Sequence, residues 1–486
     1  MRRLVCAAVA IITMFVGGCA GRDPPQGTDC ARWFVMLDEA VERAGVHDAA
    51  AYRIPGFPYL RADRFLASFR DQVRDDPAAF SEWVDRLGAL DTTARAYELR
   101  NLPTDQLRSL GVADRNVAIA KSSACAAELR RADLAMPSRR EALAERTAVP
   151  DDYSDRNRVL GLYPLATLPL SIGINHWQEA TLEMFRRTAA HETAAGAVVR
   201  YEPAGHPLGA RSATAVLAQT GTGRLGIPLL SGEDSVRLFR TFAPIFEIAT
   251  SDDDDRFGRL VWGGAPAPGV ETARPTVYRR LAFTRYRGRI LVQLVYTIWF
   301  LERPREGFLD LVSGRLDGLV FRVTLDPLAQ PLVYDTIHPC GCYHMFFPTA
   351  RVMVRPSPQP GIEWAFVPAA LPSVDPAIRL VLQIASRSHS LVGLRFDTGG
   401  RGAPYHFAED DELRALPTLD GATRSAFGPD GIVPATERVE RFVFWPTGVD
   451  DTGAMRQWGR HATAFLGRRH FDDPDLIEKR FSPSQP

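Results

Sequence analysis

The chain has 486 residues, with 58 basic and 58 acidic side chains, so its formal net charge is zero. This balance gives no electrostatic basis for binding nucleic acid or acidic lipid, and we expect no nucleic-acid partner.

The N-terminus has the order of an export signal. Arg2 and Arg3 form a basic region, and 4–16 is an apolar run too short to span a bilayer. The following Val16-Gly17-Gly18-Cys19 resembles the lipobox of bacterial lipoprotein signal peptides, over the first 19 residues only. The resemblance implies cleavage before Cys19, a diacylglyceryl thioether on its sulfur and an acyl chain on its new amine. Several acyl chains together anchor a protein stably to a membrane.

Ala20 follows the lipidated cysteine, where an inner-membrane retention signal would often have Asp. The resemblance therefore favours the outer membrane, with the protein facing the periplasm. An ordinary secretory signal with an incidental cysteine is the alternative. Both interpretations predict export.

Export to an oxidising compartment permits disulfides. Cys30 and Cys125 bracket the first helical region and are its only cysteines. We predict that they are bonded, which would stabilise the fold by up to about 4–5 kcal/mol on the chain-entropy estimate for a loop of this length.

The pattern along the chain predicts six parts. Helical periodicity begins at Cys30, and Asp114 is placed to cap a long helix, while Ser138 to Glu141 has the form of a capping box. The predicted parts are a signal peptide (1–18), the lipidated cysteine and tether (19–29), a helical domain or subdomain (30–147), a linker (148–159), an α+β domain (160–470) and a polar, disordered tail (471–486). Further helices are expected at 30–44, 61–73, 80–99 and 175–188.

Residues 160–174 are apolar but contain two prolines and two glycines. That composition argues against a membrane-spanning helix. We expect a buried or membrane-facing loop.

A run of strands occupies the centre of the chain. Alternating apolar residues predict strands at 276–286, 289–301, 317–325 and 332–337, with Arg287-Gly288 as one turn. Short connections favour an antiparallel meander. The predicted fold is α+β, with an N-terminal helical region followed by a mainly antiparallel sheet. Other predicted strands are 197–201, 362–367, 379–386, 391–396 and 441–445.

The meander leads into a segment rich in metal-binding residue types. His338, Cys340, Cys342 and His344 share one parity, so an extended chain would point all four the same way. Thiolates and imidazoles suit a zinc-like transition metal. The outer histidines would lie about 20 Å apart in a strand, so other ligands would have to come from elsewhere, with His389 and His406 as candidates.

Two other interpretations of this segment stay open. The cysteines can be buried small apolar residues in a structural loop. They can also form a strained, reducible Cys340–Cys342 disulfide with a redox role.

Two further patterns have ordinary explanations. Residues 221–226 match Gly-x-Gly-x-x-Gly, but Pro228 and Gly232 stand where a dinucleotide-binding helix should continue. The run Asp252 to Asp255 lacks the glycine and glutamate of a calcium-binding EF-hand loop, and a solvated acidic turn is expected.

The sequence favours a membrane-anchored lipoprotein of the cell envelope with a binding or structural role. No set of catalytic residues is predicted. The alternatives are a metal-dependent, hydrolase-like enzyme that uses 338–344, and a thiol–disulfide redox protein that uses Cys340 and Cys342.

Overall fold

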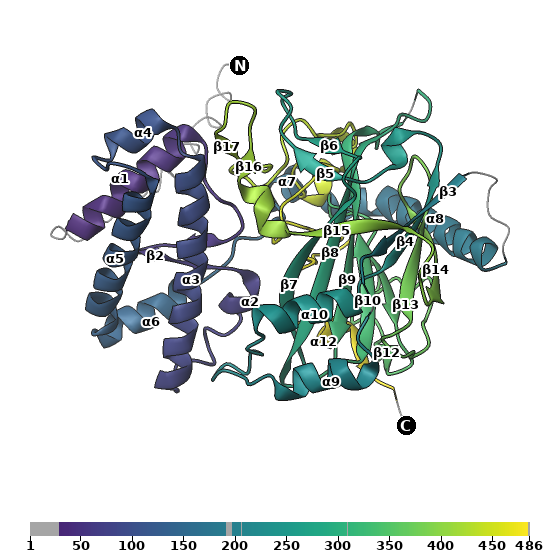
Figure 1. Cartoon of the computed structure of the whole chain (residues 1–486), viewed down its shortest axis with the longest axis horizontal. Coiled ribbons are helices and arrows are strands. Elements are labelled where there is room, and N and C mark those ends of the chain that lie inside the picture. Colours follow the sequence, from purple (N-terminus) through teal and green to yellow (C-terminus); the bar gives the residue numbers. More distant parts are fainter. Residues whose placement is uncertain (1–28, 191–196, 206, 309, 485–486) are drawn as a thin grey trace, which may run out of the picture.

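The computed structural model describes residues 29–190, 197–205, 207–308 and 310–484. These residues form an α+β fold, as predicted, with a helical region at the left of Figure 1 and a large sheet at the right. The lipobox, with Cys19 and Ala20, lies outside the described residues.

Six helices and one hairpin make up the helical region. Asp76 and Asp114 cap the two long helices, each accepting hydrogen bonds from two backbone amides of the first turn. The capping box predicted at Ser138 is wrong, because Met136 is the N-cap and no side chain caps that helix. The elements are α1 (Asp29–Ala44), β1 (Tyr52–Ile54), β2 (Phe57–Ala62), α2 (Arg64–Ala67), α3 (Pro77–Asn101), α4 (Thr104–Ser109), α5 (Arg115–Leu134) and α6 (Pro137–Arg146).

The β1–β2 hairpin corrects the prediction that 30–147 is all helical. β2 carries buried side chains at five of its six positions, including Arg61. The Arg61 guanidinium bonds to Glu98 at 2.8 Å and to Asp91 at 3.1 Å, both on α3. The strand therefore supplies a buried cation that α3 neutralises.

The predicted disulfide is present. Cys30 of α1 and Cys125 of α5 are bonded, and the bond lies at the edge of an apolar core that includes Trp33 and Trp83. The bond ties the first helix to a helix 95 residues later in the chain.

The sheet has ten strands in the order β11-β10-β9-β8-β7-β15-β3-β4-β13-β14. The predicted meander is confirmed as its antiparallel half: β7 (Thr276–Tyr286), β8 (Arg289–Arg303), β9 (Gly314–Leu325), β10 (Pro331–Ile337) and β11 (Met345–Pro348). The other half mixes parallel and antiparallel pairs: β3 (Ala197–Pro203), β4 (Ile245–Thr250), β13 (Arg379–Ile384), β14 (Leu391–Asp397) and β15 (Ala403–Glu409).

The turn between β7 and β8 is the predicted one. Arg287 and Gly288 have φ angles of 53° and 71°. Positive φ at both central residues is the type I′ geometry, whose twist matches that of the paired strands.

Several predictions for the second half of the chain are wrong. Residues 362–367 form no strand, and 441–445 form a short helix, α11 (Arg441–Phe444), and a 3₁₀ turn, η3 (Trp445–Thr447). No strand was predicted at 403–409, which form β15. The tail is ordered as α12 (Leu476–Arg480) and β18 (Phe481–Pro483), because Leu476, Ile477 and Phe481 are buried in an apolar cluster. β18 pairs with β12 (Val352–Val354).

The segment expected to be a loop at 160–174 is helical. α7 (Asp155–Leu160) leads into α8 (Tyr163–Ala189), which continues through Pro169. Its second half packs on the sheet domain, where Trp177 contacts Phe366 and Phe185 stacks on Phe347. Tertiary packing therefore overrides the breakers in the sequence. Among the described helices, none is long and apolar enough to cross a membrane.

The remaining elements connect and cover the sheet. They are α9 (Ala210–Gln219), α10 (Gly232–Thr241), η1 (Asp253–Asp255), β5 (Arg259–Val261), β6 (Gly269–Glu271), η2 (Asp410–Arg414), β16 (Leu416–Pro417) and β17 (Thr423–Arg424). In Figure 1, α9 and α10 lie in front of the sheet and α8 lies behind it.

Candidate functional site

A group of buried ionisable side chains gathers where β9 begins and β10 ends. Its centre is Asp317 of β9, which lies between His338 and His389. We call this group the sheet-end cluster; its members are Asp255, Arg303, Asp317, His338, His389, Arg438 and Glu440.

The carboxylate of Asp317 holds both histidines. Its two oxygens lie 3.1 Å from Nδ1 of His338 and 3.0 Å from Nδ1 of His389. The His389 ring is stacked on Phe300 at 3.9 Å, and its Nε2 lies 3.4 Å from Asp255. These contacts fix the orientation of each imidazole through one shared carboxylate.

The proton distribution follows from burial and neighbouring charge. Burial opposes ionisation of Asp317, but His338, His389 and Arg438 outweigh it and hold its pKa well below the usual range. Burial lowers the pKa of His338, and Asp317 offsets this only in part. Burial also works against protonation of His389, but Asp255 and Asp317 together raise its pKa. The cluster therefore combines an ionised aspartate with one histidine biased towards neutral and one biased towards charged.

Glu440 is the unusual acid of this cluster. Burial raises its pKa to about 7, and the nearby Arg438 and Arg303 compensate only in part. The Nη2 group of Arg438 donates a hydrogen bond to the backbone oxygen of Leu316 at 2.8 Å. Glu440 is therefore a member of the cluster whose charge changes near neutral pH.

The 338–344 segment is not extended, so the argument from parity fails. The amide of Gly341 donates to the carbonyl of His338 at 2.8 Å, and the amide of His338 donates to the carbonyl of Cys342 at 3.0 Å. A Cβ on Gly341 would lie 2.4 Å from the carbonyl oxygen of Ala462, so only glycine fits this turn.

The turn sends the two histidines to different partners, and this corrects the predicted metal site. His338 is held by Asp317, whereas both nitrogens of His344 are engaged, by Asp335 at 3.0 Å and by Thr463 at 3.3 Å. Among the described residues, no three His, Cys, Asp or Glu side chains are grouped to hold a metal ion. The donor set His338, Cys340, Cys342 and His344 does not fit a zinc-like metal.

The two cysteines are free, and Cys340 is buried. Cys340 packs in an apolar cluster with Trp262 and Met455. A hydrogen bond to Cys340, together with burial, raises the pKa of the Cys342 thiol well above its usual value. Because the thiolate is the reactive species, this environment is that of a structural pair of cysteines.

Some of the other residues singled out from the sequence belong to the sheet-end cluster, and others do not. His389 joins the cluster, whereas His406 is exposed on β15. The acidic run also contributes, because Asp255 is buried against His389. The glycine-rich stretch packs on α3, where the amide of Leu225 donates to Glu82 at 3.2 Å, and has no dinucleotide-binding context.

Asp317, Arg438 and Glu440 were not predicted as site residues. Asp317-Gly318 resembles the turn that opens a strand. Only its position within an otherwise apolar strand indicated a buried charge in need of partners.

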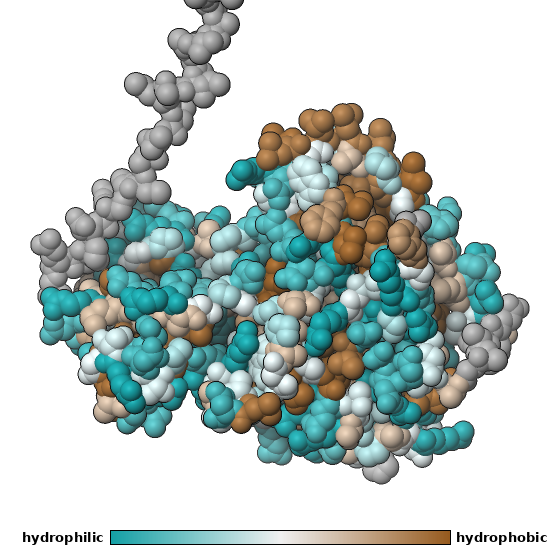
Figure 2. All heavy atoms as spheres, turned by 90° about the horizontal axis from the view of Figure 1, so that it is seen from above, coloured by the Kyte–Doolittle hydropathy of each residue, from teal (hydrophilic) through white to brown (hydrophobic). Residues whose placement is uncertain are grey.

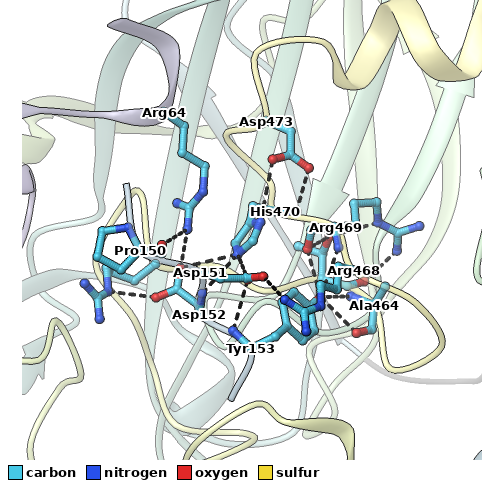
Figure 3. Close-up of polar contacts among 12 residues, drawn as sticks. Arg64, Pro150, Asp151, Asp152, Tyr153, Ala464, Arg468, Arg469, His470 and Asp473 are labelled. Atoms are coloured by element: carbon cyan, nitrogen blue, oxygen red, sulfur yellow. Dashed lines mark hydrogen bonds and ion pairs between the residues drawn. The ribbon is translucent and has the colours of Figure 1, made fainter. Parts of the chain in front are cut away.

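A second polar cluster joins the helical region to the sheet, and Figure 3 shows it. Arg64 of α2 bonds to Asp152 at 2.7 Å and to Asp472 at 3.2 Å. His470 lies 3.3 Å from Asp151 and 3.6 Å from Asp473. We call this group the junction cluster; its members are Arg64, Asp151, Asp152, His470, Asp472 and Asp473.

The junction cluster holds a charged histidine. Burial works against protonation, but Asp151 and Asp473 outweigh it and raise the pKa of His470 to about 9. Below it, the Tyr153 hydroxyl bonds to the backbone of Ala464 and of Arg469 at 2.9 Å (Figure 3). The predicted linker is thus docked against the C-terminal segment.

A cavity of about 380 Å³ lies beside the β7–β8 hairpin, where Arg285 and Arg289 line it together with Gln72, residues of 217–228 and Asp326. Arg285 donates to Ser68 at 2.9 Å and to Gln72 at 3.1 Å. Its Nη2 is buried and has no hydrogen-bond partner in the described parts of the chain. Burial lowers the pKa of Arg285, with Asp475 offsetting this only in part, so its positive charge is incompletely compensated.

Comparison with known proteins gives no relative. No family description, curated protein or solved structure matches this chain.

Proposed function

We propose that this chain is a lipid-anchored protein of the bacterial cell envelope, with a binding or structural role on the periplasmic side of the outer membrane. The observation that carries the proposal is the lipobox pattern at 16–19. The Cys30–Cys125 disulfide supports export independently, because such bonds persist in oxidising compartments.

The N-terminal peptide of the protein made in bacterial cells tests this proposal. We expect its mass to correspond to Cys19 carrying a diacylglyceryl group and an N-acyl chain. The Cys19→Ser variant should retain its signal peptide. A Cys340→Ser variant, which leaves the lipobox intact, is the matched control. An unacylated N-terminus at any other residue would contradict the anchoring.

The two buried clusters favour a structural role for most of the ionisable groups. In both, the histidines are engaged by carboxylates and closed off by the surrounding chain. Neither the metal-dependent nor the redox alternative is favoured, since His344 has no free nitrogen and the Cys342 thiol is held protonated.

Arg285 favours a second candidate function, the binding of a small anion in the cavity that it lines beside the β7–β8 hairpin. A buried guanidinium with an open donor and an incompletely compensated charge suits a carboxylate or phosphate.

Thermal unfolding in inorganic phosphate or acetate, against chloride at equal ionic strength, tests this binding. We expect the two anions to raise the melting temperature of the wild type and to have no effect on Arg285→Met. The control is Arg274→Met, which removes an exposed arginine paired with Glu271. Equal shifts in Arg285→Met and wild type would contradict the anion site.

A further inference from the structure

An apolar ridge stands on the surface where α7, α8 and α11 meet. Its side chains from α7 and α8 are between 61% and 73% exposed. Figure 2 shows brown, apolar atoms standing out from the body at the upper edge of the view, on the side where α8 lies. The ridge consists of Val159, Leu160, Leu162, Leu165, Leu168, Ile172, Phe442, Val443 and Trp445.

Two distant segments are locked together to build this ridge. Gly161 lies directly against Pro446, whose Cβ would be 2.6 Å from a Cβ at that glycine. Next to it, the Tyr163 hydroxyl donates to the carbonyl of Phe465 at 2.9 Å, and Phe444 stacks on Phe465 at 5.1 Å. These contacts fix α11 and η3 beside the start of α8.

The ridge is the outward face of a helix whose other face is packed. Leu165, Leu168 and Ile172 recur at helical spacing and are exposed, whereas Trp177 and Phe185 fasten the second half of α8 to the sheet domain. No Asp, Glu, Lys or Arg occurs between Arg158 and Glu179. A protein surface seldom leaves such a continuous apolar area in water.

We propose that this ridge inserts into the interfacial region of a phospholipid bilayer, so that α8 lies in the membrane surface. The ridge is convex, seven of its nine side chains are aliphatic, and none is charged. Such a surface gives a protein partner little to recognise specifically, whereas acyl chains adapt to any apolar shape. Trp445 at its edge is the residue type that gathers at membrane interfaces.

The proposed acyl anchor makes a lipid surface the expected partner of the ridge, and in this respect the inference rests on the proposed function. Cys19 is ten residues before the first residue of α1. An extended chain of that length reaches at most about 35 Å. The acyl chains would thus hold the body at the membrane at all times, where an exposed apolar ridge has a permanent partner. α8 does not qualify as a spanning helix, so it would lie along the surface.

Quenching of tryptophan fluorescence by brominated lipid tests the insertion. The processed protein is purified in detergent and reconstituted in phosphatidylcholine vesicles that carry bromine on the acyl chains. We expect quenching in the wild type, and its loss in Trp445→Phe. The Leu165→Glu/Leu168→Glu double variant should lose the same component. Because the ridge has no cationic side chains, phosphatidylglycerol vesicles should give the same result.

Leu419→Glu is the matched control, because Leu419 is 83% exposed and lies outside the ridge. It should be quenched like the wild type, and all variants should keep the wild-type melting temperature, since each replaced leucine is exposed and Trp445→Phe keeps an aromatic ring at a partly exposed position. Equal quenching of wild type and Trp445→Phe would overturn the proposal. Cross-linking of the ridge to an envelope protein, without quenching, would also overturn it and assign the ridge to a protein partner.

The outcomes separate this inference from the anchoring. Quenching in a protein whose N-terminal peptide carries no lipid would support the ridge and refute the anchor. An acylated protein in which Trp445 is not quenched would support the anchor and refute the insertion of the ridge.

Discussion

His338 of the sheet-end cluster and His470 of the junction cluster are both buried against aspartate, but their pKa values shift in opposite directions. Burial keeps the pKa of His338 below its usual value in spite of Asp317. His470 is also buried, but the pKa is raised to about 9. The two histidines differ in how much negative charge surrounds the imidazole. His338 shares one carboxylate with His389 and Arg438, whereas His470 has Asp151 and Asp473 on its two nitrogens.

The comparison shows that contact with one aspartate does not make a buried histidine a cation. His344 supports this conclusion, because burial lowers its pKa to about 3 although Asp335 is 3.0 Å away. The Asp335 carboxylate is already paired with Arg322 at 3.0 Å, so its negative charge is compensated. The net charge of the whole cluster decides the protonation of each member.

The largest effect should come from removing the shared carboxylate of the sheet-end cluster. Asp317→Asn leaves Arg438 without its buried counter-ion and takes the negative charge from both imidazoles. We expect a loss of about 3–5 kcal/mol in the free energy of unfolding, the usual result of breaking a buried charge pair. Urea denaturation measures it, with the exposed Asp420→Asn as the control. A loss below about 1 kcal/mol would show that the cluster is effectively solvated.

The next effect is the pH dependence of the junction. The folded-state pKa of His470 is raised above the unfolded value of about 6.5. Its contribution is therefore fully present below pH 6.5 and is lost as the pH rises through about 9. We expect up to about 3 kcal/mol of unfolding free energy to be lost across this window, from 1.36 kcal/mol per pKa unit.

The His470→Gln variant isolates this contribution, because it keeps hydrogen-bonding capacity without the titration. The difference in unfolding free energy between wild type and variant should shrink from pH 6 to pH 9.5. A constant difference would mean that His470 does not hold a proton in the folded state. The imidazole NMR signals of the wild type give the pKa directly.

The elements that could be predicted were those whose local pattern agrees with their packing. The meander followed from alternation and from the Arg287-Gly288 turn, and the two positive φ angles are its physical basis. The second half of α8 was predicted as the helix at 175–188, but its first half was not, because Pro164, Pro169 and Gly173 argue against a helix. Aromatic contacts of its second half, made with residues about 160–190 positions away, hold it in place.

The candidate site was predictable only in its residue types. His338 and His389 were both named, but Asp317, which brings them together, was predicted only as the first residue of a strand. The parity argument failed at Gly341, where a close approach to the backbone of Ala462 reverses the chain. Which carboxylate a buried histidine meets depends on strand order, and neither spacing nor composition contains that information.

The smallest effect should be a gain in stability at the edge of the sheet-end cluster. Two aspartates compensate the charge of His470, whereas the arginines near Glu440 compensate the charge of its carboxylate only in part. Burial therefore raises the pKa of Glu440 to about 7, well above the unfolded value. The folded protein therefore holds a proton that the unfolded chain releases near pH 4.5, and stability falls as the pH rises from there to about 7. Glu440→Gln removes the cost of ionising this buried acid. We expect it to raise the free energy of unfolding by about 1–3 kcal/mol at pH 8 and to have little effect near pH 4.5.

Urea denaturation at the two pH values measures the gain, with Glu437→Gln as a control at a neighbouring residue. If Glu440→Gln is destabilising at pH 8, the ionised carboxylate is paired with Arg438 or Arg303 after all, and the two clusters would then share one principle of charge compensation.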